Sequence, residues 1–202
     1  MLQHVDQWNH NTHFHRYLLR CIPLSAQSAL DVGCGLGSFA RKLAQRAVKV
    51  DAIDANPTIV AEAKSHYSAV NIHYTHADFI TSDMPLESYD IISAIASIHH
   101  MDMTRALRKM KALLRPSGTL VILGLYQERT LLDHIYSWVS VPVNYVYLLR
   151  HRASASAHTI TAPTCRAQLT LRQIKDVAND VIPGYSLKRH LLWRYSLVWR
   201  KL

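Results

Sequence analysis

The chain has 202 residues, of which 49% are hydrophobic, and its formal net charge is +9 at pH 7. This length suits one domain with a substantial core, and this apolar content, without any low-complexity tract, excludes a disordered chain. A signal-peptide-like run and a stretch of about 18 apolar residues are both missing, which argues against secretion and against a membrane span. We therefore expect one cytoplasmic domain over residues 1–202, with no transmembrane segment.

The first 24 residues are rich in histidine and end in an apolar helical pattern. Several histidines close together raise the question of a metal site. His13 and His15, however, point to different faces of a helix, and a zinc site on helices needs a further ligand of suitable type. We expect no metal site there. The cysteines are odd in number and scattered, which makes a disulfide framework or a zinc ribbon unexpected; they are Cys21, Cys34 and Cys165.

The most informative segment follows this N-terminal part. Ser28 to Val32 is a short apolar run that predicts a buried parallel strand. Three glycines at alternate positions come next, and Ser38 to Ala47 then shows helical spacing. Glycines let the backbone turn sharply and approach a ligand, and a helix N-terminus offers free N–H groups. The segment therefore predicts a nucleotide-type site.

Asp31 indicates which ligand this site takes. The third glycine of a dinucleotide fingerprint is replaced here by Ser38, and a carboxylate at the strand end repels pyrophosphate but attracts an amino-acid ammonium group. The order Asp31-x-Gly33-x-Gly35-x-Gly37 resembles motif I of the class I S-adenosylmethionine (SAM) methyltransferases. The resemblance implies that these residues and Cys34 hold the methionine part of SAM, with S-adenosylhomocysteine as product. It also implies an α/β, three-layer Rossmann-like fold, whose seven-stranded, mainly parallel sheet has an antiparallel C-terminal strand pair.

The next two strands end in acidic residues, as the resemblance requires. The strand Val48 to Ile53 leads into Asp54 and Ala55, and the family places a carboxylate there on the ribose hydroxyls. Asp51 lies inside the strand run, three residues too early. The strand from Asn71 to Ala77 is followed by the residues that the resemblance assigns to the adenine, Asp78 and Phe79.

A fourth strand, Tyr89 to Ala96, resembles the motif IV strand, which implies that its end, with Ile95, runs under the methionine part. Pro116 and Gly118 then supply a turn before a fifth strand. These landmarks cover about residues 25–126 and occur in the family's order.

His99 and His100 follow the fourth strand, in a loop that faces the ligand crevice of this fold. An imidazole can take a proton from a hydroxyl, an amine or an acidic carbon, so both are candidate catalytic residues. The sequence does not separate them. A packing role is the alternative, because the methyl group is already activated and alignment alone supplies much of the acceleration.

The segment 127–165 is the part least similar to the family. Leu131 to Val139 and Asn144 to Arg150 have helical spacing, and the sequence predicts a break between them at Pro142 and a loop over Ala153 to Thr164. This insertion can cap a lipophilic acceptor pocket, pack on a partner subunit or touch a membrane surface. With residues 1–24 as a lid, we expect the acceptor chamber to be lined by His13, His15, Tyr17, Tyr136, Trp138 and Tyr145.

The last quarter carries most of the positive charge. A helix over Thr170 to Val181 and strands over Tyr185 to Leu192 and Arg194 to Lys201 are predicted, and from Arg150 onward ten lysines and arginines face only two aspartates. Such a region attracts RNA, anionic lipid or an acidic small substrate, although several of these side chains alternate with apolar ones like a solvated strand face.

These patterns favour a SAM-dependent methyltransferase that acts on a small, partly apolar acceptor. An RNA methyltransferase that uses the basic C-terminal region is an alternative, and a SAM-binding accessory subunit is another. The sequence leaves open whether the chain forms a homodimer.

Overall fold

The structure of the chain is a computed structural model that describes residues 9–151 and 167–202. Its sheet has seven strands in the order β3-β2-β1-β4-β5-β7-β6, and only the pairs that include β7 are antiparallel. This confirms the predicted sheet and its C-terminal strand pair. The strands are β1 (Ala26–Val32), β2 (Ala47–Asp54), β3 (Ile72–His76), β4 (Tyr89–Ile95), β5 (Leu114–Gly124), β6 (Ser186–His190) and β7 (Arg194–Arg200).

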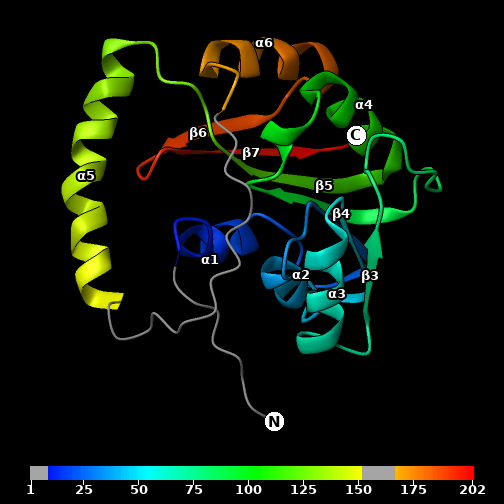
Figure 1. Cartoon of the computed structure of the whole chain (residues 1–202). Coiled ribbons are helices and arrows are strands. Elements are labelled where there is room, and N and C mark those ends of the chain that lie inside the picture. Colours follow the sequence, from blue (N-terminus) through cyan, green and yellow to red (C-terminus); the bar gives the residue numbers. More distant parts are fainter. Residues whose placement is uncertain (1–8, 152–166) are drawn as a thin grey trace.

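Helices cover both faces of the sheet, as Figure 1 shows. The crossovers from β1 to β3 and from β4 to β5 run in opposite directions along the sheet, so right-handed connections place their helices on opposite faces. One face carries α1 (Thr12–Arg20), α2 (Ser38–Leu43) and α3 (Pro57–His66), and the other carries α4 (Met103–Leu113) and α6 (Leu171–Val181).

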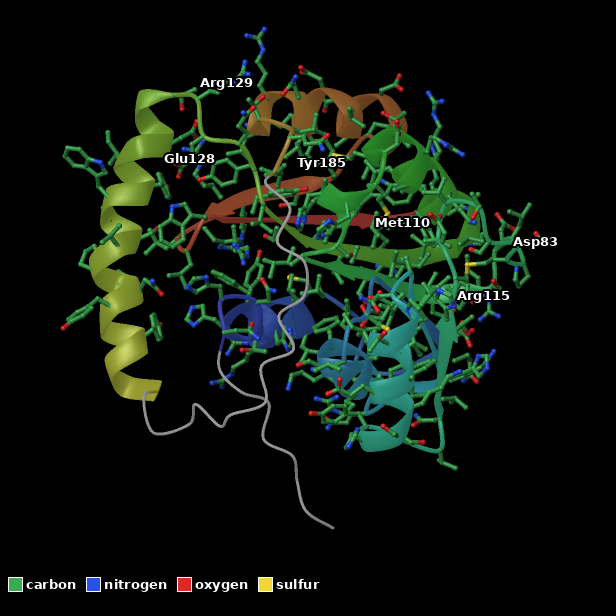
Figure 2. All side chains as sticks on the ribbon, viewed as in Figure 1. Asp83, Met110, Arg115, Glu128, Arg129 and Tyr185 are labelled. Atoms are coloured by element: carbon green, nitrogen blue, oxygen red, sulfur yellow. The ribbon has the colours of Figure 1, made fainter. Side chains whose placement is uncertain are left out.

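Each face has its own core. Met110 of α4, labelled in Figure 2, is fully buried and packs in one core with side chains of the sheet and of α6. Leu18 of α1 belongs to the other core, together with side chains of α2 and α3. The central strands β1 and β4 lie between these layers, and their second halves are buried and mostly apolar, which is typical of parallel strands covered on both faces.

The strand order reverses between β1 and β4, and this reversal positions the site. In open parallel sheets a ligand crevice forms outside the carboxyl ends of the two strands at such a point. The short helix η1 (Ile98–His100) follows β4 at this edge. The helix α5 (Leu131–His151) stands along the same edge in Figure 1, where the turn between β6 and β7 reaches it.

The predicted break at Pro142 is wrong, because α5 runs through this residue without interruption. An interior proline removes one backbone hydrogen bond and costs about 3 kcal/mol. Contacts on both sides of it offset that loss: the hydroxyl of Ser140 accepts a hydrogen bond from the N–H of Leu192 at 2.9 Å, and the Asn144 amide oxygen lies 2.8 Å from Nε2 of His10.

The end of β7 lies at the opposite edge of the sheet, where the parallel strands begin. The N–H of Ser117 donates to the carbonyl of Lys201 at 2.9 Å, and the N–H of Lys201 donates to the carbonyl of Gly118 at 2.9 Å. The ammonium group of Lys201 also pairs with Glu87 at 2.9 Å. The last residues of the chain are thus fixed to the turn that precedes the buried part of β5.

Some predictions concern residues outside the described ranges. Residues 1–8 of the expected lid, the predicted loop at 153–164 and Cys165 belong to these. Within residues 9–151 and 167–202, none of the helices combines the length and the apolar character needed to cross a bilayer.

Candidate functional site

The turn between β1 and α2 has a backbone that requires glycine. Gly33 has a φ of 68°, and a Cβ there would lie 2.2 Å from the Cβ of Ser97. Gly37 has a φ of 73°, and a Cβ there would lie 2.1 Å from the hydroxyl of Tyr74. A Cβ on Gly35, by contrast, would meet no atom within 4 Å. Two glycines therefore pack the turn tightly, and the third leaves open space beside it.

Asp31 places a carboxyl group inside the protein at the end of β1. Its side chain is buried, and the hydroxyl of Ser93 on β4 donates to its Oδ1 at 2.6 Å. Burial raises the pKa of Asp31 to about 7, and the negative charge of Asp54 raises it as well, whereas the Ser93 hydrogen bond opposes the change. Among the described residues, no cation pairs with this carboxyl group, so a positively charged ligand group would stabilise its ionised form.

Asp54 at the end of β2 holds the glycine turn. Its Oδ2 accepts a hydrogen bond from the N–H of Gly35, and its Oδ1 accepts one from the N–H of Asn56, both at 2.9 Å. A carboxylate oxygen can accept two hydrogen bonds, so each oxygen retains capacity for a ligand hydroxyl.

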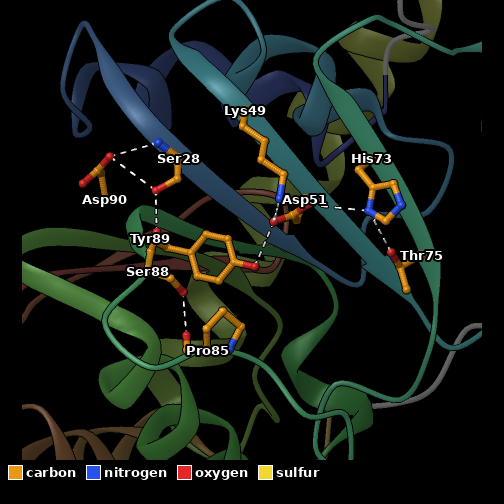
Figure 3. Close-up of polar contacts among 9 residues, drawn as sticks. All are labelled: Ser28, Lys49, Asp51, His73, Thr75, Pro85, Ser88, Tyr89 and Asp90. Carbon is orange, nitrogen blue, oxygen red and sulfur yellow. Dashed lines mark hydrogen bonds and ion pairs between the residues drawn. The ribbon is translucent and has the colours of Figure 1, made fainter.

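Asp51 contacts side chains of β2, β3 and β4, as Figure 3 shows. The hydroxyl of Tyr89 donates to its Oδ2 at 2.9 Å, and the ammonium nitrogen of Lys49 lies 3.1 Å from the same oxygen. Nδ1 of His73 lies 3.6 Å from Oδ1. The two aspartates of β2 thus have different surroundings, and only Asp54 reaches the turn.

Asp78 follows β3 and shapes the loop that comes after it. Its Oδ1 accepts hydrogen bonds from the N–H of Ile80 at 2.7 Å and from that of Thr81 at 3.1 Å, while the residue is exposed. Phe79 is instead buried in the core, with the ammonium group of Lys109 5.1 Å from its ring centroid. Of the two residues assigned to the adenine, Asp78 is therefore the one with free surface.

The other residues predicted to bind the cofactor lie around the same strand ends. Ala55 is exposed directly after β2, and Ile95 is half-buried at the end of β4. Cys34 is buried between two glycines of the turn, and burial raises the pKa of its thiol, so it is a packing residue without nucleophilic character.

The structure separates the two histidines that follow β4. His100 is exposed, whereas Nδ1 of His99 is sealed from solvent and has no hydrogen-bond partner in the part of the chain that the structure describes. The two rings are 4.1 Å apart, between centroids. Burial lowers the pKa of His99 to about 4, with smaller contributions from His100 and from Arg194, so His99 is neutral at physiological pH.

The three predicted lid residues of α1 point in three directions. His15 is buried, and its ring lies edge-on to Phe39 of α2 at 5.0 Å. His13 lies edge-on to a tyrosine ring of α5 at 4.8 Å, and Tyr17 lies 5.1 Å from the ring of His190 on β6. Only His13 and Tyr17 therefore face the elements that border the strand ends.

The aromatic residues of α5 divide between two faces of the helix. Tyr136 lies 5.0 Å from the guanidinium carbon of Arg189 and packs toward the hairpin of β6 and β7. Trp138 and Tyr145 are 79% and 63% exposed on the outward face. The structure does not bring these two to the strand ends, because the uninterrupted helix fixes which positions turn inward.

Comparisons with known proteins decide the family. Residues 29–118 match the family model described as a methyltransferase domain. The chain is also 31% identical over 200 residues to an uncharacterized methyltransferase of Mycobacterium bovis, covering 97% of this chain and 98% of that protein. The chain belongs to the class I SAM-dependent methyltransferases.

More distant relatives of this methyltransferase are similar over shorter stretches or in fold only. A ubiquinone biosynthesis O-methyltransferase of Pseudomonas fluorescens is 30% identical over 102 residues, covering 48% of this chain and 44% of that protein. The structure of a phosphoethanolamine N-methyltransferase of Haemonchus contortus with S-adenosylhomocysteine superposes with a TM-score of 0.63 at 19% identity, covering 87% of this chain and 38% of that one. The latter similarity shows the fold alone.

The cofactor of the methyltransferase is SAM, and the residues present fit it. The open space at Gly35, the buried carboxyl group of Asp31 and the spare acceptor capacity of Asp54 suit a ligand with a polar sugar and an ammonium group. Asp31 would hold the amino-acid end, Asp54 the ribose and Asp78 the adenine. When bound, SAM supplies a methyl group on a sulfonium centre.

Two supporting residues of the methyltransferase did not emerge from the sequence. Ser93 bonds Asp31, and the hydroxyl of Ser97 donates to the carbonyl of Val32 at 2.6 Å, which ties the end of β4 to that of β1. A third residue is Arg194, which is buried beside the start of α1. A serine inside a strand and a serine just after it carry no distinctive spacing, and the sequence indicated Arg194 only as one of the basic residues that RNA would contact.

Asp31 makes the ligand-free methyltransferase less stable as the pH rises. Its pKa is raised in the folded state, so between about pH 4 and 7 the folded chain binds more protons than the unfolded chain, and the free energy of unfolding falls with pH. We expect Asp31→Asn to be more stable than wild type in urea unfolding, by a larger margin at pH 8 than at pH 5, and to bind SAM more weakly. An equal margin at the two pH values would contradict this origin.

Proposed function

We propose that this methyltransferase acts on a small, partly apolar acceptor bound outside the ends of β4 and β5. The observation that supports this most directly is the closure of that edge by three separate elements. The helices α1 and α5 and the hairpin of β6 and β7 contact one another there, and small ligands commonly bind where several such elements meet at the end of a sheet.

The contacts that close the edge are specific. His10, which precedes α1, bonds the side chain of Asn144 on α5 at 2.8 Å, and the turn of the hairpin bonds Ser140 at 2.9 Å. An ion pair of 2.6 Å joins Arg189 of β6 to Asp133 of α5. Polar contacts at three heights of α5 fix the helix against the body of the protein.

The same contacts weaken the case for RNA as the acceptor. Arg189 is paired with Asp133 and lies over two tyrosine rings, and Arg194 is buried, so neither presents its charge at the surface to an RNA backbone. Lys201 is paired with Glu87 at the far edge of the sheet. Three of the basic side chains that favoured RNA as a partner are therefore paired with carboxylates of this chain or buried.

The names of the relatives agree with a small acceptor. The Pseudomonas protein is named for O-methylation in ubiquinone biosynthesis, and the Haemonchus protein was solved with phosphomonomethylethanolamine. These two acceptors differ in the atom that is methylated, so the comparison supports the size class of the acceptor and not its identity.

His99 is the residue placed to receive a proton from the acceptor. It follows β4, is half-buried, and carries an unprotonated ring at neutral pH because burial, with smaller contributions from His100 and Arg194, lowers its pKa to about 4. His100, which is exposed, has no comparable position.

We expect His99→Ala to reduce turnover by about 10²–10⁴ while SAM affinity stays nearly unchanged. His100→Ala, the matched control, should change turnover by less than about threefold. Since His99 is in its accepting form above pH 4, wild-type turnover should not fall between pH 7 and pH 5 through this group. A small loss in His99→Ala at every pH would mean that alignment alone drives the reaction.

The acceptor class is tested by incubating the enzyme with tritiated SAM and two fractions of a cell extract, one holding small molecules and one holding total RNA. We expect label in an organic-soluble small molecule. Label in RNA, or RNA binding in about 0.15 M salt that weakens steeply as salt rises, would overturn the proposal.

A further inference from the structure

Arg194, the first residue of β7, is a buried arginine without an acidic partner. Arg194 is only 8% exposed to solvent. Its Nε donates to the amide oxygen of Asn11 at 2.9 Å, and its Nη1 donates to the carbonyls of Leu192 at 3.3 Å and Trp193 at 3.5 Å. All these partners are neutral, and none of the bonds uses Nη2.

Two other partly buried arginines do have a carboxylate. Arg189 pairs with Asp133 at 2.6 Å, and Arg115 pairs with Asp90 at 3.1 Å. Among the described residues, no carboxylate lies within ion-pair distance of Arg194. Burial lowers its pKa only to about 10, so the guanidinium is charged at neutral pH.

A buried charge without a counterion is costly, and an anion that binds beside it removes part of that cost. The geometry also limits the anion. The neutral partners take one edge of the guanidinium, and the nitrogen that stays open can meet one further group. The nitrogen that stays open is Nη2, and the guanidinium carries one positive charge. A carboxylate suits this group because it carries one negative charge and accepts hydrogen bonds from guanidinium N–H groups in the plane of the guanidinium.

The place of Arg194 in the sheet indicates whose carboxylate this is. Strands are about 4.8 Å apart, so the start of β7 lies about 10 Å from β4 and about 14 Å from β1. The methionine part of SAM belongs over β1 and β4, near Asp31. Arg194 lies on the other side of β4, close enough to His99 for its charge to lower the pKa of that imidazole.

We propose that Arg194 binds a carboxylate of the methyl acceptor, so that the acceptor is a partly apolar carboxylic acid. This rests on the proposed function, because it places the acceptor at the edge of the sheet that α1, α5 and the hairpin border. His99 lies between the carboxylate and the cofactor, on the path along which the acceptor nucleophile must reach the methyl group. The net charge of +9 favours the approach of such an anion.

The test measures how the protein, saturated with S-adenosylhomocysteine, binds benzoate and its uncharged analogue benzamide in an NMR titration. We expect benzoate to bind at least tenfold more tightly to wild type. Arg194→Gln should remove this difference. Arg200→Gln, which deletes an exposed arginine from the far end of the same strand, should retain it. Equal binding of the two probes to wild type would overturn the proposal, and so would tighter binding of phenyl phosphate than of benzoate.

Arg194 also joins α1 to the hairpin, so Arg194→Gln can lose its fold. Arg194→Lys keeps the charge and should keep a reduced preference for benzoate, and the wild-type comparison decides the question without any variant. The affinity of Arg194→Gln for S-adenosylhomocysteine should stay within threefold of wild type. A tenfold loss would show that Arg194 serves the methionine carboxylate and would overturn the proposal.

The two proposals fail in different ways. Label from tritiated SAM in RNA alone would overturn the proposed function, whatever the benzoate titration gives. Label in a neutral small molecule, with no preference for benzoate, would overturn the carboxylate site and leave the proposed function in place.

Discussion

Replacing Asp54 by alanine is expected to weaken SAM binding at least tenfold without unfolding the protein. We predict that the variant loses the acceptor of two ribose hydrogen bonds, and charge-assisted hydrogen bonds contribute about 1.5–3 kcal/mol each. It also releases the N–H groups of Gly35 and Asn56, which Asp54 holds at 2.9 Å, so the glycine turn is less well ordered before SAM arrives. Titration calorimetry on both proteins measures the change.

Asp51→Asn is the matched control for this variant. It removes a carboxylate from the same strand, but one that contacts Tyr89 and Lys49 and not the glycine turn. Its SAM affinity should equal that of wild type. Normal SAM binding by Asp54→Ala, or binding of NAD in place of SAM by wild type, would contradict the assignment of the ribose site.

Two glycine variants should separate cofactor binding from folding. Gly35→Ala puts a methyl group into open space beside the turn, so we expect SAM binding to be lost while the fold persists with a cost of about 1–2 kcal/mol for the left-handed backbone. Gly33→Ala has the same backbone cost but also places its Cβ 2.2 Å from the Cβ of Ser97. That variant should fail to accumulate as folded protein.

Thermal unfolding followed by circular dichroism, with calorimetric SAM titration, distinguishes the two outcomes. The prediction fails if Gly35→Ala binds SAM like wild type, since the open space would then not belong to the cofactor. It also fails if Gly33→Ala melts at the wild-type temperature, because the backbone at Ser97 would then have moved aside at little cost.

The parts of the fold that the sequence predicts well are those with local causes. Positive φ values at three alternate glycines, apolar strands and acidic strand ends follow from residues next to one another in the chain. The choice of Asp54 over Asp51 also follows from local spacing, because the two residues of one strand face different surroundings. The mainly parallel sheet with its antiparallel C-terminal pair is confirmed, and the residues assigned to the cofactor remain a prediction.

The acceptor half depends on packing between distant segments, and there the predictions were weaker. The break expected at Pro142 did not occur, because the contacts of Ser140 and Asn144 with other elements stabilise α5 on both sides of it. Trp138 points outward because α5 is one uninterrupted helix. The sequence predicted two shorter helices instead, and their spacing did not indicate this direction.

The burial of Arg194 also depends on packing between distant segments, so the sequence did not predict it. Basic residues that alternate with apolar ones in the last quarter suggested a solvated strand face, and Lys188 is indeed exposed. Arg194 turns inward because Asn11, some 180 residues away in the chain, offers its amide oxygen there. Only the folded arrangement distinguishes an arginine in the interior from one at the surface.

The anchoring of Lys201 at the far edge of the sheet has a practical consequence for the measurements above. Lys201 lies at the edge of the sheet where the parallel strands begin, whereas the glycine turn and η1 follow the ends of β1 and β4, so a biotin or a fluorophore attached to Leu202 leaves the binding edge accessible. A label near the start of α1 would instead lie beside Asn11 and Arg194. Immobilisation for affinity measurements is therefore best made through the C-terminal end.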